Sequence, residues 1–236
     1  MSAGKIHAGT SGWAYTSWKN GFYPPKLSSK EFLEYYATRL NSVEVNYTFR
    51  QFPTPELLVE WISMVPSDFI FAVKAHQWIT HFKRLREAAD ITWEFLDTLR
   101  HLRKAKRMGP VLFQLRPDFK CNVPLLKDFL KCLPRGTRAA FEFRNATWFC
   151  DEVYEVLRRK NVALCHAESE ELETPHVDTA DFSYLRLRKD SYSPKSRNEI
   201  SKRVGRLERK GDVFAYFKHE DTPEGALYAE ALLKKT

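Results

Sequence analysis

The sequence predicts an α/β fold, a (β/α)8 TIM barrel in which a closed parallel sheet of eight strands is surrounded by about seven helices. Eight near-continuous apolar runs alternate with segments of helical periodicity, which is typical of parallel strands buried on both faces. Eight such units close a barrel, and 236 residues is an ordinary length for one. No GxGxxG motif follows the first strand, which disfavours an open doubly wound sheet. We therefore expect one TIM-barrel domain over residues 1–236.

The first half of the chain contains four predicted strands and three predicted helices. The strands are expected at residues 6–10, 42–46, 69–73 and 110–113. The helices are expected at residues 28–40, 55–64 and 87–104. Ser28 or Ser29 suits the cap of the first helix, and Pro55 suits the first turn of the second. The third helix has an apolar stripe at helical spacing, which predicts one long amphipathic helix.

The second half repeats the pattern with four more strands. These are expected at residues 139–143, 162–165, 182–185 and 213–217. Helices are expected at residues 123–133, 152–160, 195–209 and 222–233, with Thr222 and Pro223 opening the last one. The connection from the sixth to the seventh strand is short and acidic, so we expect no full helix there.

Composition limits the class of protein. No apolar run approaches the ~18 residues of a membrane span, so we expect no membrane partner. The N-terminal residues lack the apolar region of a secretory signal. Cys121, Cys132, Cys150 and Cys165 are widely spaced without a CxxC motif, which favours reduced thiols in a cytoplasmic protein over a disulfide frame or a zinc site.

The net charge of +8 is concentrated in one segment. Residues 186–210 contain ten Lys or Arg residues and three acidic residues. Such a patch can raise the rate of encounter with phosphate-rich partners, including nucleic acid. The alternative is a solvated helix face, which is the commoner explanation of a charged run.

A carboxylate lies within the fifth predicted strand. Glu142 stands between Phe141 and Phe143, and Arg144 follows. A carboxylate in an apolar strand is costly to desolvate unless it is paired or faces a site. Residues i and i+2 of a strand point to the same side, so Glu142 and Arg144 share a face. Either they form an ion pair that only stabilises the core, or Arg144 holds an anion beside an acid or base.

Polar residues end most of the other strands as well. In a TIM barrel the reactive groups come from the carboxyl ends of the strands, so these residues form the candidate site. The strand ends supply Glu44, Asn46, Lys74, Gln114, Glu142, Arg144, His166, Glu168, Arg186, Lys218 and His219. Glu44, Glu142 and Lys74 are the catalytic candidates, the carboxylates as acid and base. Lys74 also forms an anion clamp with Arg144 and Arg186, and Trp13 and Trp148 offer flat walls for a sugar or base.

Several blocks of sequence together resemble the YecE-like barrel family, a domain of unknown function. In order, these blocks are GTSGWAYTSW with FYP, EVNYTF, KAHQWITH, LFQLRP, EFRNATW, LRLR and YFKHED, and they cover nearly the whole chain. The resemblance implies a TIM barrel with a polar pocket, and it implies no established reaction. The matching pocket positions are Trp13, Glu44, Asn46, Lys74, Thr80, His81, Gln114, Glu142, Arg144 and Trp148. The chain departs from the family pattern at Arg116, Asn145, Arg188, Lys218 and His219.

Two functions from different classes follow. The first is an enzyme, a hydrolase or isomerase, acting on a small anionic, phosphate-containing substrate at the C-terminal mouth of the barrel. The second is a non-catalytic nucleic-acid-binding protein that uses the basic segment from Arg186 to Lys210. A divalent metal is not favoured because the candidate ligands lack HxH or HExxH spacing. Those candidates are Glu44, His81, Glu142, His166, Glu168, His219 and Glu220.

Overall fold

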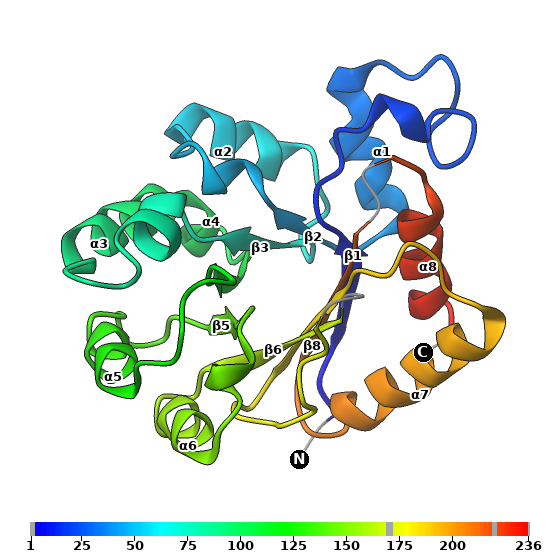
Figure 1. Ribbon diagram of the computed structural model, residues 1–236. Helices are drawn as coiled ribbons and strands as arrows, with labels where there is room; N and C mark the ends of the chain where they lie inside the picture. The colour runs from blue at the N-terminus through cyan, green and yellow to red at the C-terminus, as the bar shows by residue number, and fades with distance from the viewer. Residues whose placement is uncertain (1–2, 169–171, 219–220, 236) are drawn as a thin grey trace.

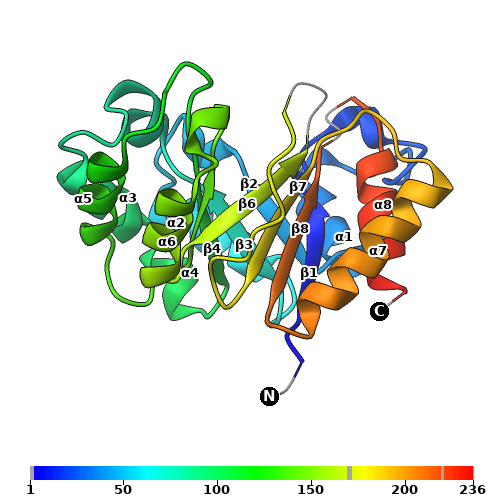
Figure 2. The ribbon, with the colours of Figure 1, turned by 60° about the horizontal axis from the view of Figure 1, so that its bottom comes forward.

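The computed structural model describes residues 3–168, 172–218 and 221–235 and has the predicted architecture. Its strands are β1 (Ile6–Thr10), β2 (Ser42–Val45), β3 (Ile70–Lys74), β4 (Met108–Gln114), β5 (Ala139–Glu142), β6 (Ala163–Glu168), β7 (Ser183–Leu187) and β8 (Val213–Phe217). Its α-helices are α1 (Phe32–Arg39), α2 (Pro55–Ser63), α3 (Ala89–Thr98), α4 (Arg100–Lys104), α5 (Val123–Lys131), α6 (Asp151–Arg159), α7 (Pro194–Glu208) and α8 (Glu224–Leu233). The strands occupy the centre and the helices surround them (Figures 1 and 2).

All strand pairs run parallel, in the order β1-β8-β7-β6-β5-β4-β3-β2. The TIM-barrel prediction is therefore confirmed, and in the described chain an α-helix follows seven of the eight strands. The predicted helix at 87–104 is divided into α3 and α4. The division falls at Leu99, which is fully buried and whose ψ of 6° lies outside the helical region. Between β6 and β7, residues 172–182 form no helix, as the short acidic connection predicted.

The ring closes between β1 and β2 mainly through side chains. One isolated bridge, between Ser11 and Glu44, joins the backbones of these two segments. Asn41 adds two bonds, because its amide donates to the carbonyl of Ile6 and its oxygen accepts from the N–H of Ala8. A Cβ on Gly9 would lie 1.9 Å from the carbonyl oxygen of Ser42, so only glycine allows the two strands to approach this closely.

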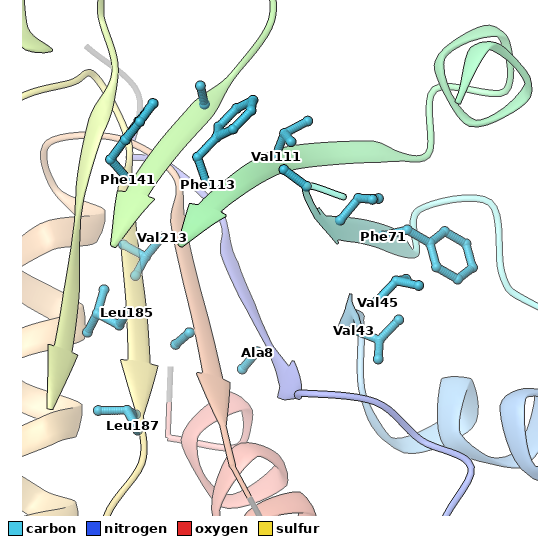
Figure 3. Close-up of a cluster of buried hydrophobic side chains, with 14 of the residues drawn as sticks. Ala8, Val43, Val45, Phe71, Val111, Phe113, Phe141, Leu185, Leu187 and Val213 are labelled. Carbon is cyan, nitrogen blue, oxygen red and sulfur yellow. The ribbon is translucent and has the colours of Figure 1, made fainter. Parts of the chain in front are cut away.

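The strand side chains alternate between two cores. Val43 and Val45 of β2, Phe113 of β4 and Leu185 of β7 belong to the cluster that packs between the sheet and the helices (Figure 3). The other face of the strands fills the barrel interior, where small residues of β3, β5 and β6 oppose aromatic residues of β7 and β8. Those interior residues are Ala72, Ala140, Ala163, Cys165, Tyr184, Phe214 and Tyr216. Glu44, between Val43 and Val45, therefore faces the interior.

The four cysteines are free. Cys165 fills part of the barrel interior and is fully buried. Burial raises the pKa of its thiol, so Cys165 packs as a small apolar side chain and not as a thiolate nucleophile. No helix in the described part of the chain has both the length and the apolar character needed to cross a bilayer.

Candidate functional site at the C-terminal mouth of the barrel

A buried arginine bridges two carboxylates at the C-terminal ends of the strands. Nη1 of Arg186 donates to Oε2 of Glu142 at 2.6 Å, and Nη2 donates to Oε1 of Glu44 at 2.7 Å. None of these three residues is more than 2% exposed. Strand β7 pairs with β6 and β8, so its contacts with β2 and β5 cross the barrel interior. The guanidinium therefore ties distant parts of the ring together.

Neutral donors complete the coordination of both carboxylates. Ser11 Oγ donates to Oε1 of Glu44 at 2.8 Å, and the Tyr184 hydroxyl donates to Oε2 at 2.7 Å. Gln114 Nε2 donates to Oε1 of Glu142 at 2.7 Å. Each carboxylate oxygen thus accepts at least one hydrogen bond, which holds the buried charges in a fixed geometry. We refer to Glu44, Glu142 and Arg186 as the buried triad.

The triad is ionised. Burial acts to raise the pKa of each glutamate, but the charge of Arg186 and the hydrogen bonds outweigh burial. The net effect lowers the pKa of Glu44 and lowers that of Glu142 to about 2. Burial acts to lower the pKa of Arg186, and the two carboxylates outweigh it and raise that pKa. Carboxyl groups with such low pKa values are weak bases and are not protonated near neutral pH.

Lys74 ends β3 at the same mouth and has a different environment. Its Nζ lies 4.1 Å from the centroid of the Phe49 ring. Within the described ranges its ammonium has no hydrogen-bond or ion-pair partner. Burial and the charge of Arg186 lower the pKa of Lys74 to about 8, against the opposing effect of Glu44 and Glu142. An accessible amine with this pKa can accept or donate a proton near neutral pH.

The segment after β3 lies beside Lys74. The His81 ring packs edge-on against Phe49, with 4.8 Å between centroids, and His81 Nδ1 lies 2.9 Å from the Thr80 hydroxyl. Burial and the charge of Lys74 lower the pKa of His81 to about 4, so this imidazole is neutral near pH 7. Thr80 is buried and His81 is half-buried. The predicted residues of this segment thus reach the mouth.

Arg186 is the main ion-pair partner of Glu142, and the ion pair with Arg144, one of the two alternatives from the sequence, is present as a longer contact. Arg144 Nε lies 3.9 Å from Glu142 Oε1, and its side chain is 40% exposed. Arg188, two residues beyond Arg186 on β7, has no hydrogen-bond or ion-pair partner within the described chain. Burial and the charge of Arg186 lower the pKa of Arg188. Arg144, Arg188 and Glu142 line one small pocket.

The predicted aromatic walls differ in position. Trp13 is half-buried in the loop after β1 and packs edge-on against Trp61 at 5.2 Å. Trp148 is fully buried, stacks on Phe143 and donates from Nε1 to the carbonyl of Phe119 at 2.6 Å. Trp148 therefore packs beneath the loop in this structure, and its assignment to substrate binding stays a prediction.

The remaining strand-end residues differ in position: Asn46 and Lys218 follow strands at the mouth, whereas His166 lies on the outer face of β6. The Oδ1 atom of Asn46, directly after β2, is buried and has no partner in the described structure. Lys218 is half-buried and follows β8, whereas His219 lies outside the described residues. His166 points away from the interior and lies 3.2 Å from the carbonyl oxygen of Val177. It is therefore part of the outer packing.

Sequence reasoning missed Ser11, Tyr184 and Arg188 as members of the site. A period of two in the segment Tyr184-Leu185-Arg186-Leu187-Arg188 places its polar residues on one strand face, and that signal was available. Ser11 has no comparable signal, because a serine in a glycine-bounded turn is ordinary turn chemistry.

The donor set at the mouth does not favour a metal ion. No group of three or more His, Cys, Asp or Glu side chains in residues 3–168, 172–218 and 221–235 is arranged to bind one. The Arg186 guanidinium lies between the two buried carboxylates and donates to both. Two of the candidate ligands, His219 and Glu220, lie outside the described residues.

Two curated proteins are similar to the chain in sequence. The chain is 31% identical over 157 residues to UPF0759 protein YunF of Bacillus subtilis and 32% identical over 145 residues to UPF0759 protein YecE of Escherichia coli K12. These matches cover 64% and 61% of the chain and 54% and 50% of the relatives, so the chain spans about half the length of the curated relatives it matches.

Solved structures support the fold. A DUF72 family protein from Thermotoga maritima superimposes with a TM-score of 0.87 at 24% identity, covering 98% of both chains. A DUF72 family protein from Enterococcus faecalis superimposes with a TM-score of 0.77 at 18% identity, also covering 98% of both chains. The family model described as protein of unknown function DUF72 matches residues 7–236, and the chain therefore belongs to the DUF72 family.

Proposed function

We propose that the protein is an enzyme that binds a small anionic, phosphate-bearing substrate at the C-terminal mouth of the barrel. The supporting observation is a set of polar groups at this mouth that have no partner among the described residues. They are Lys74 Nζ, the Arg188 guanidinium, the buried Asn46 Oδ1 and the buried Arg186 Nε. Buried polar groups usually have partners, so such a set favours a site that a ligand completes.

The charges at the mouth suit an anion. Arg188 is half-buried and is the main candidate for a phosphate contact, because a guanidinium binds phosphate oxygens through paired N–H groups. Arg144 follows β5 and Lys218 follows β8, so both add positive charge at the carboxyl ends of strands. Arg186 is already engaged with both glutamates through Nη1 and Nη2, and its buried Nε has no partner among the described residues.

Proton transfer is assigned to Lys74 in this proposal. Glu44 and Glu142 were the acid and base expected from the sequence, but the low pKa of each makes a carboxylate that positions Arg186 the better role. Lys74, with a pKa of about 8, changes protonation state within the working range of an enzyme. The reaction class stays that of a hydrolase or isomerase of phosphate compounds.

The basic segment gives weaker support for nucleic-acid binding. Arg186 and Arg188 belong to the barrel mouth, Lys189 pairs with Glu168, and Lys210 pairs with Asp178. Of the basic residues on α7, Lys195, Lys202 and Arg206 are exposed, as on a solvated helix surface. Binding of nucleic acid to this segment would appear as an affinity that falls steeply with salt and that survives Arg188→Gln.

Calorimetric titration with inorganic pyrophosphate tests the proposed site. We expect the wild-type protein to bind and Arg188→Gln to bind about tenfold more weakly or worse, the usual worth of a charge-assisted hydrogen bond. Arg159→Gln is the matched control, because Arg159 is an exposed arginine on α6 that pairs with Glu155. Absence of binding, or equal loss in both variants, would overturn the proposal.

A further inference from the structure

We propose that Lys74 is a covalent nucleophile whose amine condenses with the carbonyl carbon of a phosphate-bearing aldehyde or ketone. This inference rests on the proposed function, because the phosphate is what holds the carbonyl compound at the mouth. It goes beyond that function by naming the reacting atom of the enzyme and the carbonyl class of the substrate. Three observations support it: the position of Lys74 at the end of β3, the charges around its amine, and the lack of a hydrogen-bond partner for that amine among the described residues.

The position of Lys74 suits attack on a bound molecule. It is the last residue of β3 and shares the interior face with Ala72, so its side chain rises from the barrel interior into the mouth. The Nζ atom lies 4.1 Å from the Phe49 ring centroid, and this ring covers one side of the amine. Within residues 3–168, 172–218 and 221–235 no oxygen atom is in hydrogen-bonding contact with it, so no bond must be broken before it reacts.

The charges around Lys74 favour the neutral amine. Arg186 of β7 and Arg188, directly after β7, oppose its protonation, and Glu44 of β2 and Glu142 of β5 favour it. Both carboxylates are already paired with Arg186, which reduces their electrostatic stabilisation of a second cation, the Lys74 ammonium. At pH 7, a pKa of about 8 leaves ~10% of the amine neutral. An ordinary lysine, with a pKa near 10.4, is neutral in only ~0.04% of molecules.

The step balances without a co-reactant. The neutral nitrogen adds to the carbonyl carbon, a C–N bond forms, and one N–H proton moves to the oxygen to give a carbinolamine. The C–O bond then breaks and the oxygen leaves as water with the second N–H proton, so that C=N replaces C=O. No atom is oxidised or reduced. When protonated, the imine is an electron sink that stabilises the electron pair left by proton removal at the adjacent carbon.

Pyridoxal 5′-phosphate is a suitable probe because it combines an aldehyde with a phosphate. The protein is treated with a substoichiometric amount of the probe at pH 7.5, reduced with borohydride, and digested for peptide mass spectrometry. We expect the label at Lys74 about tenfold or more above any exposed lysine, since its neutral fraction is larger. The labelling rate should rise through pH ~8 and level off above it.

Two variants define the specificity. Lys74→Arg keeps the positive charge and removes the nucleophile, so the main labelled peptide should disappear. Lys160→Arg, at the exposed end of α6, should leave the labelling unchanged. Mapping the label on the wild-type protein needs neither variant, so the test holds even if Lys74→Arg folds poorly.

The outcomes separate this inference from the proposed function. Labelling spread evenly over surface lysines, in a protein that still binds pyrophosphate through Arg188, would overturn the covalent role and leave the anion site intact. Labelling at Lys74 that excess inorganic phosphate does not slow would support the reactive amine and contradict an adjacent phosphate site. Selective labelling that phosphate slows supports both.

Discussion

Two cations share the mouth of this barrel and have opposite surroundings. Arg186 is 1% exposed and donates to two carboxylates that are themselves held by Ser11, Tyr184 and Gln114. Lys74 ends β3 at the same mouth, and its amine has only an aromatic ring as a specific neighbour within the described chain. The charge of Arg186 is paired with two carboxylates, whereas Lys74 is subject to the repulsion of Arg186.

The difference separates structure from chemistry at the same strand ends. A buried ion group with all its partners is fixed, strongly ionised and costly to alter, so it serves to shape the site. A cation without a partner contributes little to folding, and its proton is easily lost. Polar residues at strand ends therefore do not all have the same role, and their contacts, not their types, decide which are reactive.

Replacing Arg186 should give the largest effect. Arg186→Met leaves Glu44 and Glu142 buried without their cation, and we expect the free energy of unfolding to fall by at least ~5 kcal/mol. Urea unfolding followed by circular dichroism measures this loss. The matched control Arg159→Met, on the exposed face of α6, should change stability by no more than ~0.5 kcal/mol. Equal stability of the two variants would show that the triad does not hold the barrel together.

Acid should release the stabilisation that the triad supplies. Glu142 has a lowered pKa of about 2 in the folded protein and about 4.5 when unfolded, so its contribution is present above pH ~4.5 and is lost as pH falls toward 2. The loss from this one group is about 3 kcal/mol. In Arg186→Met the carboxyl pKa values should instead be raised, so stability should increase on acidification from pH 8 to 5. Identical pH slopes in both proteins would contradict the assignment.

Glu142→Gln should cost less than loss of the arginine. The triad carries two negative charges and one positive charge, so removing one carboxylate leaves Arg186 paired with Glu44. We expect a loss of ~1–3 kcal/mol, the worth of a hydrogen bond to a charged group, and not the larger cost of a stranded cation. Thermal unfolding of Glu142→Gln beside Glu44→Gln measures it. A loss as large as that of Arg186→Met would mean that Glu142 alone balances the arginine.

Lys74→Met should have the smallest effect on folding. The substitution removes a cation that the neighbouring arginines disfavour and keeps the length of the apolar stem, so the free energy of unfolding should change by less than ~1 kcal/mol. Labelling by pyridoxal 5′-phosphate should be lost in the same variant. A large loss of stability would place Lys74 with the triad as a structural residue.

The sequence was sufficient to predict the barrel because its signals are local and repeated. The alternation that places Val43 outside and Glu44 inside is visible in β2, and the same period governs β4, β5 and β7. The division of α3 from α4 at Leu99 was missed, because the apolar stripe continues across it and only the backbone angles change.

The site was predictable as a set of residues but not as a set of contacts. Glu142 and Arg144 are two residues apart and share a face, so an ion pair between them was one of two alternatives. The main partner, Arg186, comes from another strand and reaches Glu142 across the interior. Which of several cations enters a barrel depends on side-chain length and on the volume left by small residues such as Ala140 and Ala163. The volume available inside the barrel depends on residues of several strands, so it cannot be inferred from the sequence of one strand.

The closure of the barrel between β1 and β2 is weaker than the pairing of the other strands, so a bound ligand should stabilise it. Among the described residues, one isolated backbone bridge joins these strands, with side-chain bonds from Asn41 and Tyr36, whereas backbone ladders join the other neighbouring strands. The same closure brings Ser11 to Glu44, so a fluctuation that parts the strands also removes a donor from the triad. Local opening of this kind costs less than global unfolding and is visible in amide hydrogen exchange. A molecule bound at the mouth would hold β1 and β2 together. Its binding should therefore slow amide exchange in β1 and β2 more than in the other strands.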